Sequence, residues 1–395
     1  MMLGLVLSAL VAQQPALPIE VPFRIGEDAI IVDAVVNGHK ASLMFDTGFS
    51  GTVILSDELN VGPATGTMAL RDFVGQFEAK TVRVNSMKLG ALNVAEQGME
   101  IVQQPMSHMS SSYNTHTDGI MGLEAVKSYV VEINVERKCF IFHPKSTDIS
   151  GRTPDNKKTF LGKMLPIGRN SIEMTVSAQN GGKLTLALDT GNAFFATTHR
   201  DVLERVGLWE QDKKPDFMRS AWVASGPVDS WDAQMSNMTI FGVPVTSSVW
   251  SIIDLPSSSA EGDGTVGFGF LRNFNITIDM ERRRVWLDNW TGKVSKDPDA
   301  DVGLSCAYDP IAKRVKVFRV TPGSPAEKAG IKKGDSVLGV DALELSNLGP
   351  RQLYNLMQGP PGSTIKLAIS RDGNLTRHEL VRALLVNVVK PGTSQ

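Results

Sequence analysis

The chain has 395 residues, of which 42% are hydrophobic and 21% charged, and its formal net charge is −2. This is the composition of a soluble globular protein. Domains usually have roughly 100–200 residues, so a chain of this length suggests about two to four domains. The near-neutral charge and the scattered basic residues argue against nucleic acid or an anionic membrane as a partner.

The first 19 residues are predicted to be a leader segment. The apolar run from Met1 to Ala12 is shorter than the about 20 residues that span a bilayer, so no stable membrane span is expected. It resembles the apolar part of a secretory signal, which predicts export to the periplasm or the extracellular space. Because a basic stretch before the run is missing, a cytoplasmic protein without a signal is the alternative.

Two pairs of similar segments follow. The first pair is NGHKASLMFDTG (37–48) and NGGKLTLALDTG (180–191), which share seven of twelve residues. The second pair is DGIMGLEAVKSYVVEINVERKCFIF (118–142) and DGTVGFGFLRNFNITIDMERRRVWL (263–287). The distance from Asp46 to Asp118 is 72 residues and that from Asp189 to Asp263 is 74. Two ordered blocks at matching separation predict an internal duplication.

The duplication predicts two lobes, at residues 20–146 and 162–290, with a polar linker at 147–161. A second linker, at 291–300, leads to a domain at 301–390 with its own apolar pattern. Apolar residues alternate with their neighbours over 30–36 and 184–188, and short apolar runs end at Pro or Gly. The lobes are therefore predicted to be mainly β, with a short helix at 268–274.

An Asp-Thr-Gly triplet follows an apolar strand in each lobe, at Asp46 and at Asp189. A single triplet of this kind is most often an ordinary turn, but packing of duplicated lobes would bring the two carboxyl groups face to face. Two carboxyl groups in one site share a proton, because both cannot ionise easily. The ionised member can take a proton from a bound water, and the other can donate one to a carbonyl oxygen. This pattern predicts that Asp46 and Asp189 are catalytic.

The other residues of the two triplets are predicted to support the pair. Thr47 and Thr190 are expected to hydrogen-bond across the pseudo-twofold axis and to make the two loops rigid. Gly48 and Gly191 permit a sharp turn close to the carboxylate and are expected to offer it their backbone N–H groups.

These motifs resemble those of the pepsin-like and retropepsin-like aspartic peptidases over about residues 20–290. The motifs are FDTGFS (45–50), ALDTGNA (187–193), DGIMGL (118–123) and GFGFLRNFNITID (267–279). The resemblance implies two duplicated aspartic-protease-type β lobes with a central cleft and the catalytic pair Asp46 and Asp189. It also implies that the segments ending at Gly122 and Gly267 lie beneath the catalytic loops and support them.

The sequence departs from that family at two places. The residue after each triplet is Phe49 or Asn192, where the family usually has Ser, Thr or Ala, so a supporting hydroxyl is missing. The second place is the flaps, for which residues 64–80 and 219–233 are the candidates, with Gly66, Gly75 and Gly226 as hinges or tips. No metal or other cofactor is expected, because no group of His and Cys residues has ligand spacing.

The segment VTPGSPAEKAGIKKGDSVLGVDALEL (320–345) resembles the centre of PDZ domains, and the resemblance extends over roughly 301–388. Ser324 is predicted to cap a short helix that ends at Gly330. A strand is expected at 336–340 and a longer helix at 351–357. The resemblance implies a PDZ-like α+β domain.

In that family an apolar-Gly-apolar loop binds a peptide carboxylate, and Val302, Gly303 and Leu304 match it. A C-terminal or internal peptide would then bind by adding a strand to a sheet edge. The alternative is an interaction or stabilising module that has no free peptide ligand.

The sequence as a whole predicts an exported aspartic endopeptidase whose PDZ-like domain binds substrate or partner peptides. The competing hypothesis is a non-catalytic protein that uses the same cleft to hold peptides, and Phe49 keeps it open.

Overall fold

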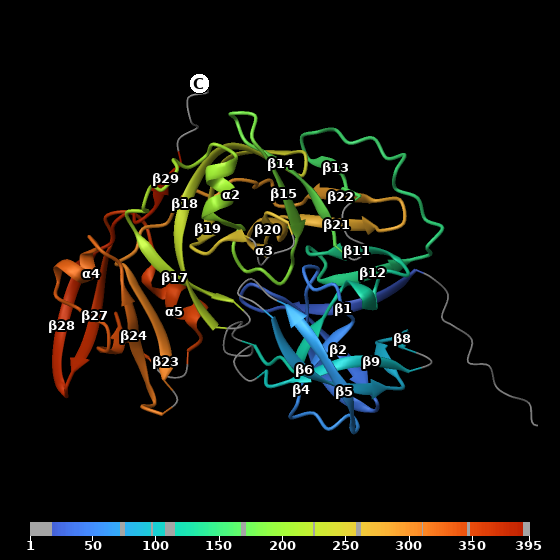
Figure 1. Cartoon of the computed structure of the whole chain (residues 1–395), viewed down its shortest axis with the longest axis horizontal. Coiled ribbons are helices and arrows are strands. Elements are labelled where there is room, and N and C mark those ends of the chain that lie inside the picture. Colours follow the sequence, from blue (N-terminus) through green and yellow to red (C-terminus); the bar gives the residue numbers. More distant parts are fainter. Residues whose placement is uncertain are drawn as a thin grey trace, which may run out of the picture.

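The computed structural model describes residues 18–71, 76–95, 98–106, 115–166, 171–223, 226–257, 262–309, 311–345 and 348–389 (Figure 1). Most of the predicted leader, residues 1–17, and the proposed flap residue Gly75 lie outside these ranges. No helix in the described part of the chain is long and apolar enough to cross a membrane.

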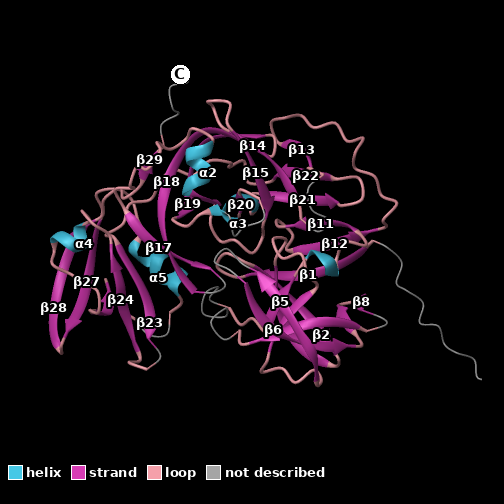
Figure 2. Cartoon of the chain, in the orientation of Figure 1, coloured by secondary structure: helices cyan, strands magenta, loops and turns pink. Residues whose placement is uncertain are grey.

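The described chain is mainly β, as predicted, and Figure 2 shows strands in every region of the molecule. Between residues 19 and 143 the elements are β1 (Ile19–Ile25), β2 (Ile30–Val36), β3 (His39–Phe45), β4 (Val53–Ser56), β5 (Ala64–Arg71), β6 (Gln76–Val84), β7 (Met87–Leu89), β8 (Leu92–Ala95), β9 (Met99–Gln104), β10 (Gly119–Met121), the 3-10 helix η1 (Leu123–Ala125), β11 (Val130–Asn134) and β12 (Cys139–His143).

Between residues 159 and 289 the elements are β13 (Thr159–Lys163), β14 (Glu173–Ser177), β15 (Lys183–Leu188), β16 (Ala196–His199), α2 (Arg200–Arg205), β17 (Met218–Val223), β18 (Gly226–Ile240), β19 (Val243–Ile253), β20 (Gly264–Val266), α3 (Phe268–Leu271), β21 (Phe274–Asp279) and β22 (Arg284–Asn289). The predicted helix at 268–274 is thus shorter than expected, because Phe274 already starts β21. We call 19–143 the first β unit and 159–289 the second β unit.

The two units contain the same succession of strand pairings. In the first, β3 pairs with β10 in parallel and β10 pairs with β4 in antiparallel orientation. In the second, β15 pairs with β20 in parallel and β20 with β16 in antiparallel orientation. β10 and β20 are buried three-residue strands, and each begins with a glycine that approaches a backbone carbonyl closely. A Cβ atom on Gly119 would lie 2.1 Å from the Ile54 oxygen, and one on Gly264 would lie 2.1 Å from the Thr197 oxygen.

The units are joined within one 15-stranded sheet of the described residues, part of which has the order β13-β22-β21-β11-β12-β1. The central pairing of this part, between β11 and β21, is antiparallel and places Val131 opposite Ile278 and Ile133 opposite Ile276. These four side chains belong to one hydrophobic cluster that extends through both units. The units therefore share a core and do not meet only at polar surfaces.

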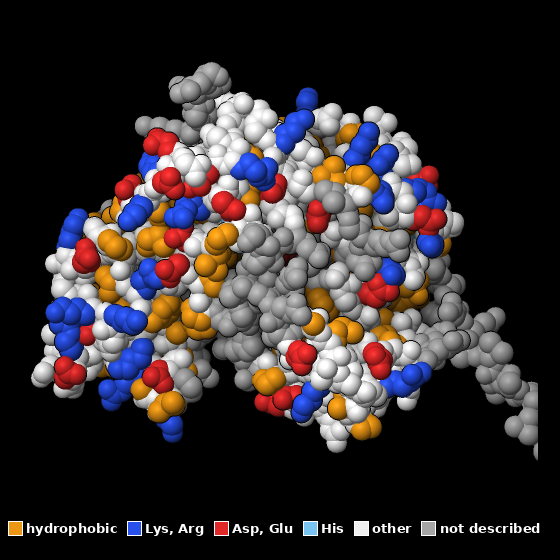
Figure 3. All heavy atoms as spheres, in the orientation of Figure 1, with side chains coloured by type: hydrophobic (Ala, Val, Ile, Leu, Met, Phe, Trp, Pro, Cys, Tyr) orange, Lys and Arg blue, Asp and Glu red, His pale blue; other side chains and the backbone are white. Residues whose placement is uncertain are grey.

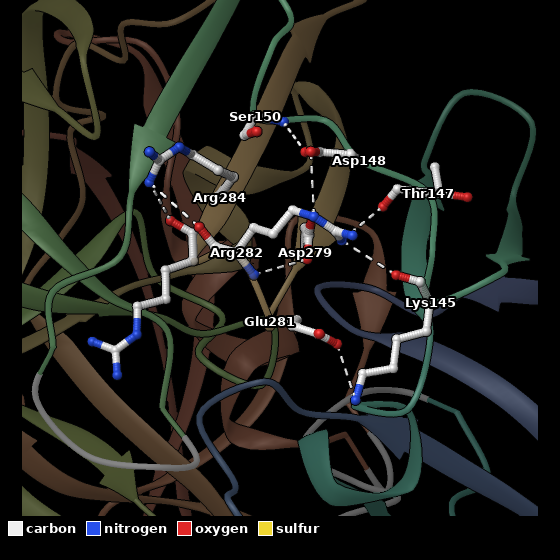
Figure 4. A network of polar contacts seen from close by, with 9 residues as sticks. Lys145, Thr147, Asp148, Ser150, Asp279, Glu281, Arg282 and Arg284 are labelled. Carbon is white, nitrogen blue, oxygen red and sulfur yellow. Dashed lines mark hydrogen bonds and ion pairs between the residues drawn. The ribbon is translucent and has the colours of Figure 1, made fainter.

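The arginine run 282–284 fixes the segment that leaves the first unit (Figure 4). Arg282 donates to the carbonyl oxygens of Lys145 and Thr147 at 3.2 and 3.1 Å and lies 3.3 Å from Asp148 Oδ2. Lys145 in turn pairs with Glu281 at 3.0 Å. Arg282 and Arg283 lie in the β21–β22 turn and Arg284 starts β22, and Arg282 has a structural role there. On the face drawn in Figure 3, basic and acidic side chains are intermixed, in keeping with the near-neutral net charge.

The C-terminal domain has a separate sheet and core. Its elements are β23 (Leu304–Asp309), β24 (Arg314–Val320), α4 (Pro325–Lys328), β25 (Ser336–Val340), β26 (Leu343–Glu344), α5 (Pro350–Met357), β27 (Thr364–Arg371), β28 (Asn374–Val381) and, beyond its sheet, β29 (Asn387–Val388). The sheet order is β23-β24-β25-β27-β28. Ser324 caps α4 as predicted, its hydroxyl accepting from Glu327 N at 3.2 Å. Gly330 follows the helix at φ +76°, a backbone conformation that favours glycine.

A buried ionic cluster attaches the C-terminal domain to the second β unit. Arg219 on β17 pairs with Asp301, which precedes β23, and lies 3.3 Å from Asp232 on β18. Tyr354 on α5 donates to Asp232 at 3.2 Å. Burial alone would lower the pKa of the guanidinium, but the charges of Asp301 and Asp232 outweigh it and raise that pKa. The cluster is therefore an internal ion triad between two domains.

A second contact attaches α5 to the first β unit. Arg351 Nε donates to Asp28 Oδ2 at 2.7 Å, and Arg272 of the second unit donates to Asp28 Oδ1 at 3.1 Å. One carboxylate of the first unit is thus held by both other parts of the molecule.

The segment after β28 returns to the second unit. β29 pairs in parallel with β18, with Asn387 opposite Ala233. Asn387 also accepts from Asp216 N at 2.7 Å and donates to Asp232 O at 3.2 Å. Val389 then enters the core of the two units. Residues 383–389, which we call the strap, thus fasten the C-terminal domain at its second end.

We predict that Arg219→Met lowers the free energy of unfolding by about 3–5 kcal/mol, because it leaves Asp232 and Asp301 buried without a counter-charge. Urea unfolding at pH 7 measures the change. Arg283→Met, in the exposed β21–β22 turn, is the control and should change stability by no more than about 0.5 kcal/mol. Equal stability of the two variants would show that the triad contributes nothing to docking.

Candidate active site

The two Asp-Thr-Gly turns meet at the junction of the β units. Asp46 follows β3 and Asp189 follows β15, and each backbone N–H bonds to the neighbouring parallel strand. Asp46 N donates to Met121 O at 2.9 Å, and Asp189 N donates to Val266 O at 3.0 Å. The sheets thus fix the start of both turns in equivalent positions.

The two threonines cross between the turns. The Thr47 hydroxyl donates to Leu188 O at 2.7 Å and accepts from Thr190 N at 3.0 Å. The Thr190 hydroxyl donates to Phe45 O at 2.7 Å and accepts from Thr47 N at 3.1 Å. Both side chains are buried, at 2% and 0% exposure. Four hydrogen bonds between buried groups therefore hold each turn against the strand of the other unit.

The carboxyl groups lie against each other, and each covers the glycine of the opposite turn. Asp46 and Asp189 are joined by a side-chain hydrogen bond. A Cβ atom on Gly48 would lie 2.7 Å from Asp189 Cγ, and one on Gly191 would lie 2.4 Å from Asp46 Cγ. Only glycine leaves room for this approach, so the triplet's third residue is required by the geometry of the pair.

Backbone N–H groups orient both carboxylates. Gly48 N and Phe49 N donate to Asp46 Oδ1 at 2.8 and 3.1 Å. Gly191 N and Asn192 N donate to Asp189 Oδ1 at 2.9 and 3.1 Å. The expected glycine donors are thus present, and the residue after each triplet is a second donor that the sequence did not predict.

The electrostatics of the pair favour one shared proton. Burial raises the pKa of Asp46. Burial also raises the pKa of Asp189 well above its usual range, and the adjacent charge of Asp46 raises it further. Asp189 is 7% exposed and Asp46 is half-buried, so the pair is open on one side. Two carboxyl groups in this arrangement bind one proton between them over a wide pH range.

A hydroxyl supports Asp189 from a position outside its turn. The Thr265 hydroxyl lowers the pKa of Asp189 in part, while Asn192 Nδ2 donates to Thr265 Oγ1 at 2.7 Å. Thr265 aligns with Ile120 of the first unit, which cannot do the same for Asp46. The alignment of 118–122 with 263–267 marks this hydroxyl, which lies outside the position after the triplet where the prediction placed it.

Gly122 and Gly267 lie beneath the two turns. Gly122 N donates to Thr52 O at 2.9 Å and Gly267 N donates to Phe195 O at 3.0 Å. A Cβ atom on Gly122 would lie 2.5 Å from Phe49 O, and one on Gly267 would lie 2.5 Å from Asn192 O. Both glycines therefore let a backbone segment pass directly under an Asp-Thr-Gly turn.

The loop after Asp189 also contacts the C-terminal domain. The Arg351 guanidinium of α5 lies 5.4 Å from the centre of the Phe194 ring. A cavity of about 300 Å³ lies beside this contact, lined among others by Asp28, Phe194 and Arg351. The turn that carries Asp189 is thus in direct contact with a helix of another domain.

The two hairpins proposed as flaps are formed by β5–β6 and β17–β18. Gly66 lies within β5 and Gly226 starts β18. Trp222 on β17 is 37% exposed and packs edge-on against Phe318 of the C-terminal domain, with 6.0 Å between the ring centres. The second hairpin is therefore held by the C-terminal domain on one side.

The predicted peptide-binding residues Val302, Gly303 and Leu304 lie far from the carboxyl pair in sequence and are all buried. Val302 and Gly303 precede β23, Leu304 is its first residue, and the segment is packed against the loop that leads into α4. Gly303 O accepts from Thr321 N at 2.8 Å, and Val302 O accepts from Ala326 N at 3.0 Å.

Comparison with known proteins identifies the C-terminal domain. Residues 292–380 match the family model of the PDZ domain. A carboxyl-terminal-processing protease from Picosynechococcus sp. is 37% identical over 68 residues, which cover 17% of this chain and 16% of that protein. Carboxyl-terminal-processing peptidase 2, chloroplastic, from Arabidopsis thaliana is 39% identical over 80 residues, which cover 19% of this chain and 15% of that protein. Among solved structures, the photosystem II D1 C-terminal processing protease matches with a TM-score of 0.22 and 29% identity, over 23% of this chain and 25% of that chain.

The chain contains a PDZ domain, as predicted, and its relatives are proteases. The comparisons contradict the prediction of an aspartic-type endopeptidase, because the relatives are carboxyl-terminal-processing proteases and not aspartic peptidases. The physical reason for the error is that a motif such as FDTGFS specifies the local geometry of a turn and not a class of enzyme. The chain spans about a sixth of the length of the curated relatives it matches, so the match transfers no catalytic residue to it.

We predict that Thr190→Val lowers the free energy of unfolding by about 3 kcal/mol. The change leaves Thr47 N–H and Phe45 C=O buried without partners, and each such group costs about 1–3 kcal/mol. Urea unfolding at pH 7 measures the effect. Thr190→Ser keeps the hydroxyl and should cost only about 1 kcal/mol; an equal loss in both variants would mean that packing and not hydrogen bonding holds the turns.

We also predict that Asp189→Asn raises stability at pH 7. Carboxyl groups whose folded pKa is raised stabilise the fold at pH values below their unfolded pKa of about 3.9, and this stabilisation is lost as pH rises through the folded pKa. Asparagine removes the charge that the fold disfavours and keeps an oxygen for Gly191 N. The free energy of unfolding is measured for both proteins at several pH values between 3.5 and 7. The variant should be more stable than the wild type by an amount that decreases as the pH falls. A constant difference across this range would contradict a shared proton.

Proposed function

We propose that this chain is a protease for peptide or protein substrates, that Asp46 and Asp189 are catalytic residues, and that its PDZ domain binds substrate or partner peptides. The single observation that carries the proposal is the hydrogen-bonded carboxyl pair, buried at the meeting point of two units and supplied with backbone donors.

A pair that shares one proton offers a base and an acid to the same reacting group. Such a pair can accept a proton at one carboxylate and donate one from the other, which is the chemistry of general acid–base groups. The crossed threonine hydroxyls hold both groups in position before substrate arrives. Thr47, Gly48, Thr190 and Gly191 are therefore positioning residues in this proposal, with Gly122 and Gly267 supporting the turns from below.

We further propose that residues 20–146 and 162–290 are duplicated lobes with a cleft between them, followed by linkers and by the PDZ domain at 301–390. The matching pairings of β3, β10 and β4 with those of β15, β20 and β16 support the duplication. The position of the carboxyl pair, half open at the junction, supports a cleft there. The apolar segment at the N-terminus supports export as part of the same proposal.

The position of the PDZ domain supports a part in substrate handling. Its helix α5 contacts both β units, through Asp28 and through Phe194, which is five residues after Asp189. A peptide held by this domain would therefore lie close to the elements that carry the carboxyl pair.

The test is cleavage of unfolded β-casein by the full chain between pH 3 and 7. We expect Asp46→Asn and Asp189→Asn each to lower the rate by at least about 100-fold, the lower end of the range for acid–base groups. The wild-type rate should fall as pH rises through the raised pKa of the pair, because the shared proton is then lost.

Asp155→Asn, at an exposed turn carboxylate, is the control and should leave the rate unchanged. Cleavage that persists in both dyad variants would place the catalysis elsewhere. Peptide binding without any cleavage would favour the non-catalytic peptide-binding protein.

A further inference from the structure

The loop of the PDZ domain that would receive a peptide carboxylate already holds one. Gly303, at φ +81°, donates its backbone N–H to Asp301 Oδ1 at 2.6 Å. Successive backbone N–H groups in such a turn form a small concave site that binds anions. In this chain the anion at that loop is the side chain of Asp301, which is 2% exposed.

The charge around Asp301 opposes a second carboxylate. Its other oxygen pairs with Arg219, and the same guanidinium also serves Asp232. Burial raises the pKa of Asp232, and the nearby charge of Asp301 adds to the increase. One cation thus already faces two carboxylates in a buried site, and a terminal carboxylate would add a third negative charge with no new counter-charge.

Other segments close the loop from the outside. A Cβ atom on Gly303 would lie 2.3 Å from Ser324 Cβ and 3.0 Å from Leu385 Cδ1. The strap exchanges two backbone hydrogen bonds with Asp301, from Asp301 N to Ala383 O at 3.0 Å and from Ala383 N to Asp301 O at 2.9 Å. A chain end could reach the loop only after the strap had separated from it.

The strand that follows the loop remains available. Within the described part of the chain β23 pairs with β24 alone, so one edge of β23 has no strand partner. Figure 1 shows β23 at the edge of the PDZ sheet nearest the β units and β28 at the far edge. Ser305, Ala307 and Tyr308 on this strand are half-buried, and α5 lies alongside it. An extended chain can pair with such an edge through its backbone without a free carboxylate.

We infer that the PDZ domain takes an internal stretch of extended polypeptide at the open edge of β23 and does not recognise a C-terminal carboxylate. Charge disfavours a peptide C-terminus, because Asp301 already fills the anion site. Shape disfavours it too, because the strap closes the end of the groove where a terminus would lie. The inference rests on the proposed peptide binding by this domain and names the kind of peptide.

The test uses overlapping twelve-residue peptides of β-casein, each prepared with a free C-terminal carboxylate and with a C-terminal amide. Binding to the full chain is measured by fluorescence anisotropy. We expect the two forms of each binding peptide to have Kd values within about threefold of each other. A larger preference for the carboxylate form overturns the inference, and so does the absence of any binding peptide.

Hydrogen exchange locates the bound peptide. Saturation with the tightest amidated peptide should slow exchange of the backbone amides of β23, and protection confined to the β units would overturn the inference. Asp301→Ala frees the N–H of Gly303. In this variant the carboxylate form of a peptide should bind about tenfold more tightly than the amide form. The wild-type comparison decides the question even where this variant does not fold.

These readouts need no turnover. If the chain is not a protease, no cleavage is observed, but the anisotropy and exchange results are as expected. If the peptide-binding inference is wrong, the anisotropy or exchange results differ from expectation while cleavage is still observed.

Discussion

The crossed hydrogen bonds of Thr47 and Thr190 are the constraint on which the rest of the site depends. Each hydroxyl satisfies one N–H and one C=O of the opposite turn, so neither turn has its buried backbone groups paired without the other. The two carboxyl groups are thereby held together although their mutual repulsion and burial oppose it. The turns, the shared core and the β11–β21 pairing therefore support the contact of the pair.

The two sides of the pair are alike in backbone and different in side chain. Both carboxylates accept from two successive N–H groups, but only Asp189 has the hydroxyl of Thr265 beside it, in a chain of bonds that begins at Asn192. The equivalent residue next to Asp46 is Ile120, which packs in a small apolar cluster. Similar turns with unequal neighbours thus give two chemically equal groups different environments, and such differences separate the pKa values of paired carboxyl groups.

The sequence predicted the features that depend on local pattern. Alternation predicted β2 and β15, the Ser-Pro-Ala segment predicted the cap of α4, and the two blocks predicted that Asp46 and Asp189 would occupy equivalent places. It did not predict the contacts that join segments distant in sequence: Arg219 with Asp301, Arg351 with Asp28, and the strap with β18. No periodicity marks such pairs, because each residue by itself has the pattern of an ordinary surface position. The assignment of an enzyme class failed for a related reason, since it was drawn from short turn motifs while the relatives found are carboxyl-terminal-processing proteases.

The pairing of β29 with β18 has a consequence for the order in which the chain is completed during translation. β18 lies at residues 226–240, and the strand that fills its remaining edge lies at 387–388. At the usual rates of about 5–20 residues per second, the second β unit waits on the order of ten seconds on the ribosome before this partner exists. During that interval the Asp232 carbonyl, which later receives the Asn387 amide, has no such donor. The second unit therefore reaches its final hydrogen bonding only after the whole PDZ domain has been made.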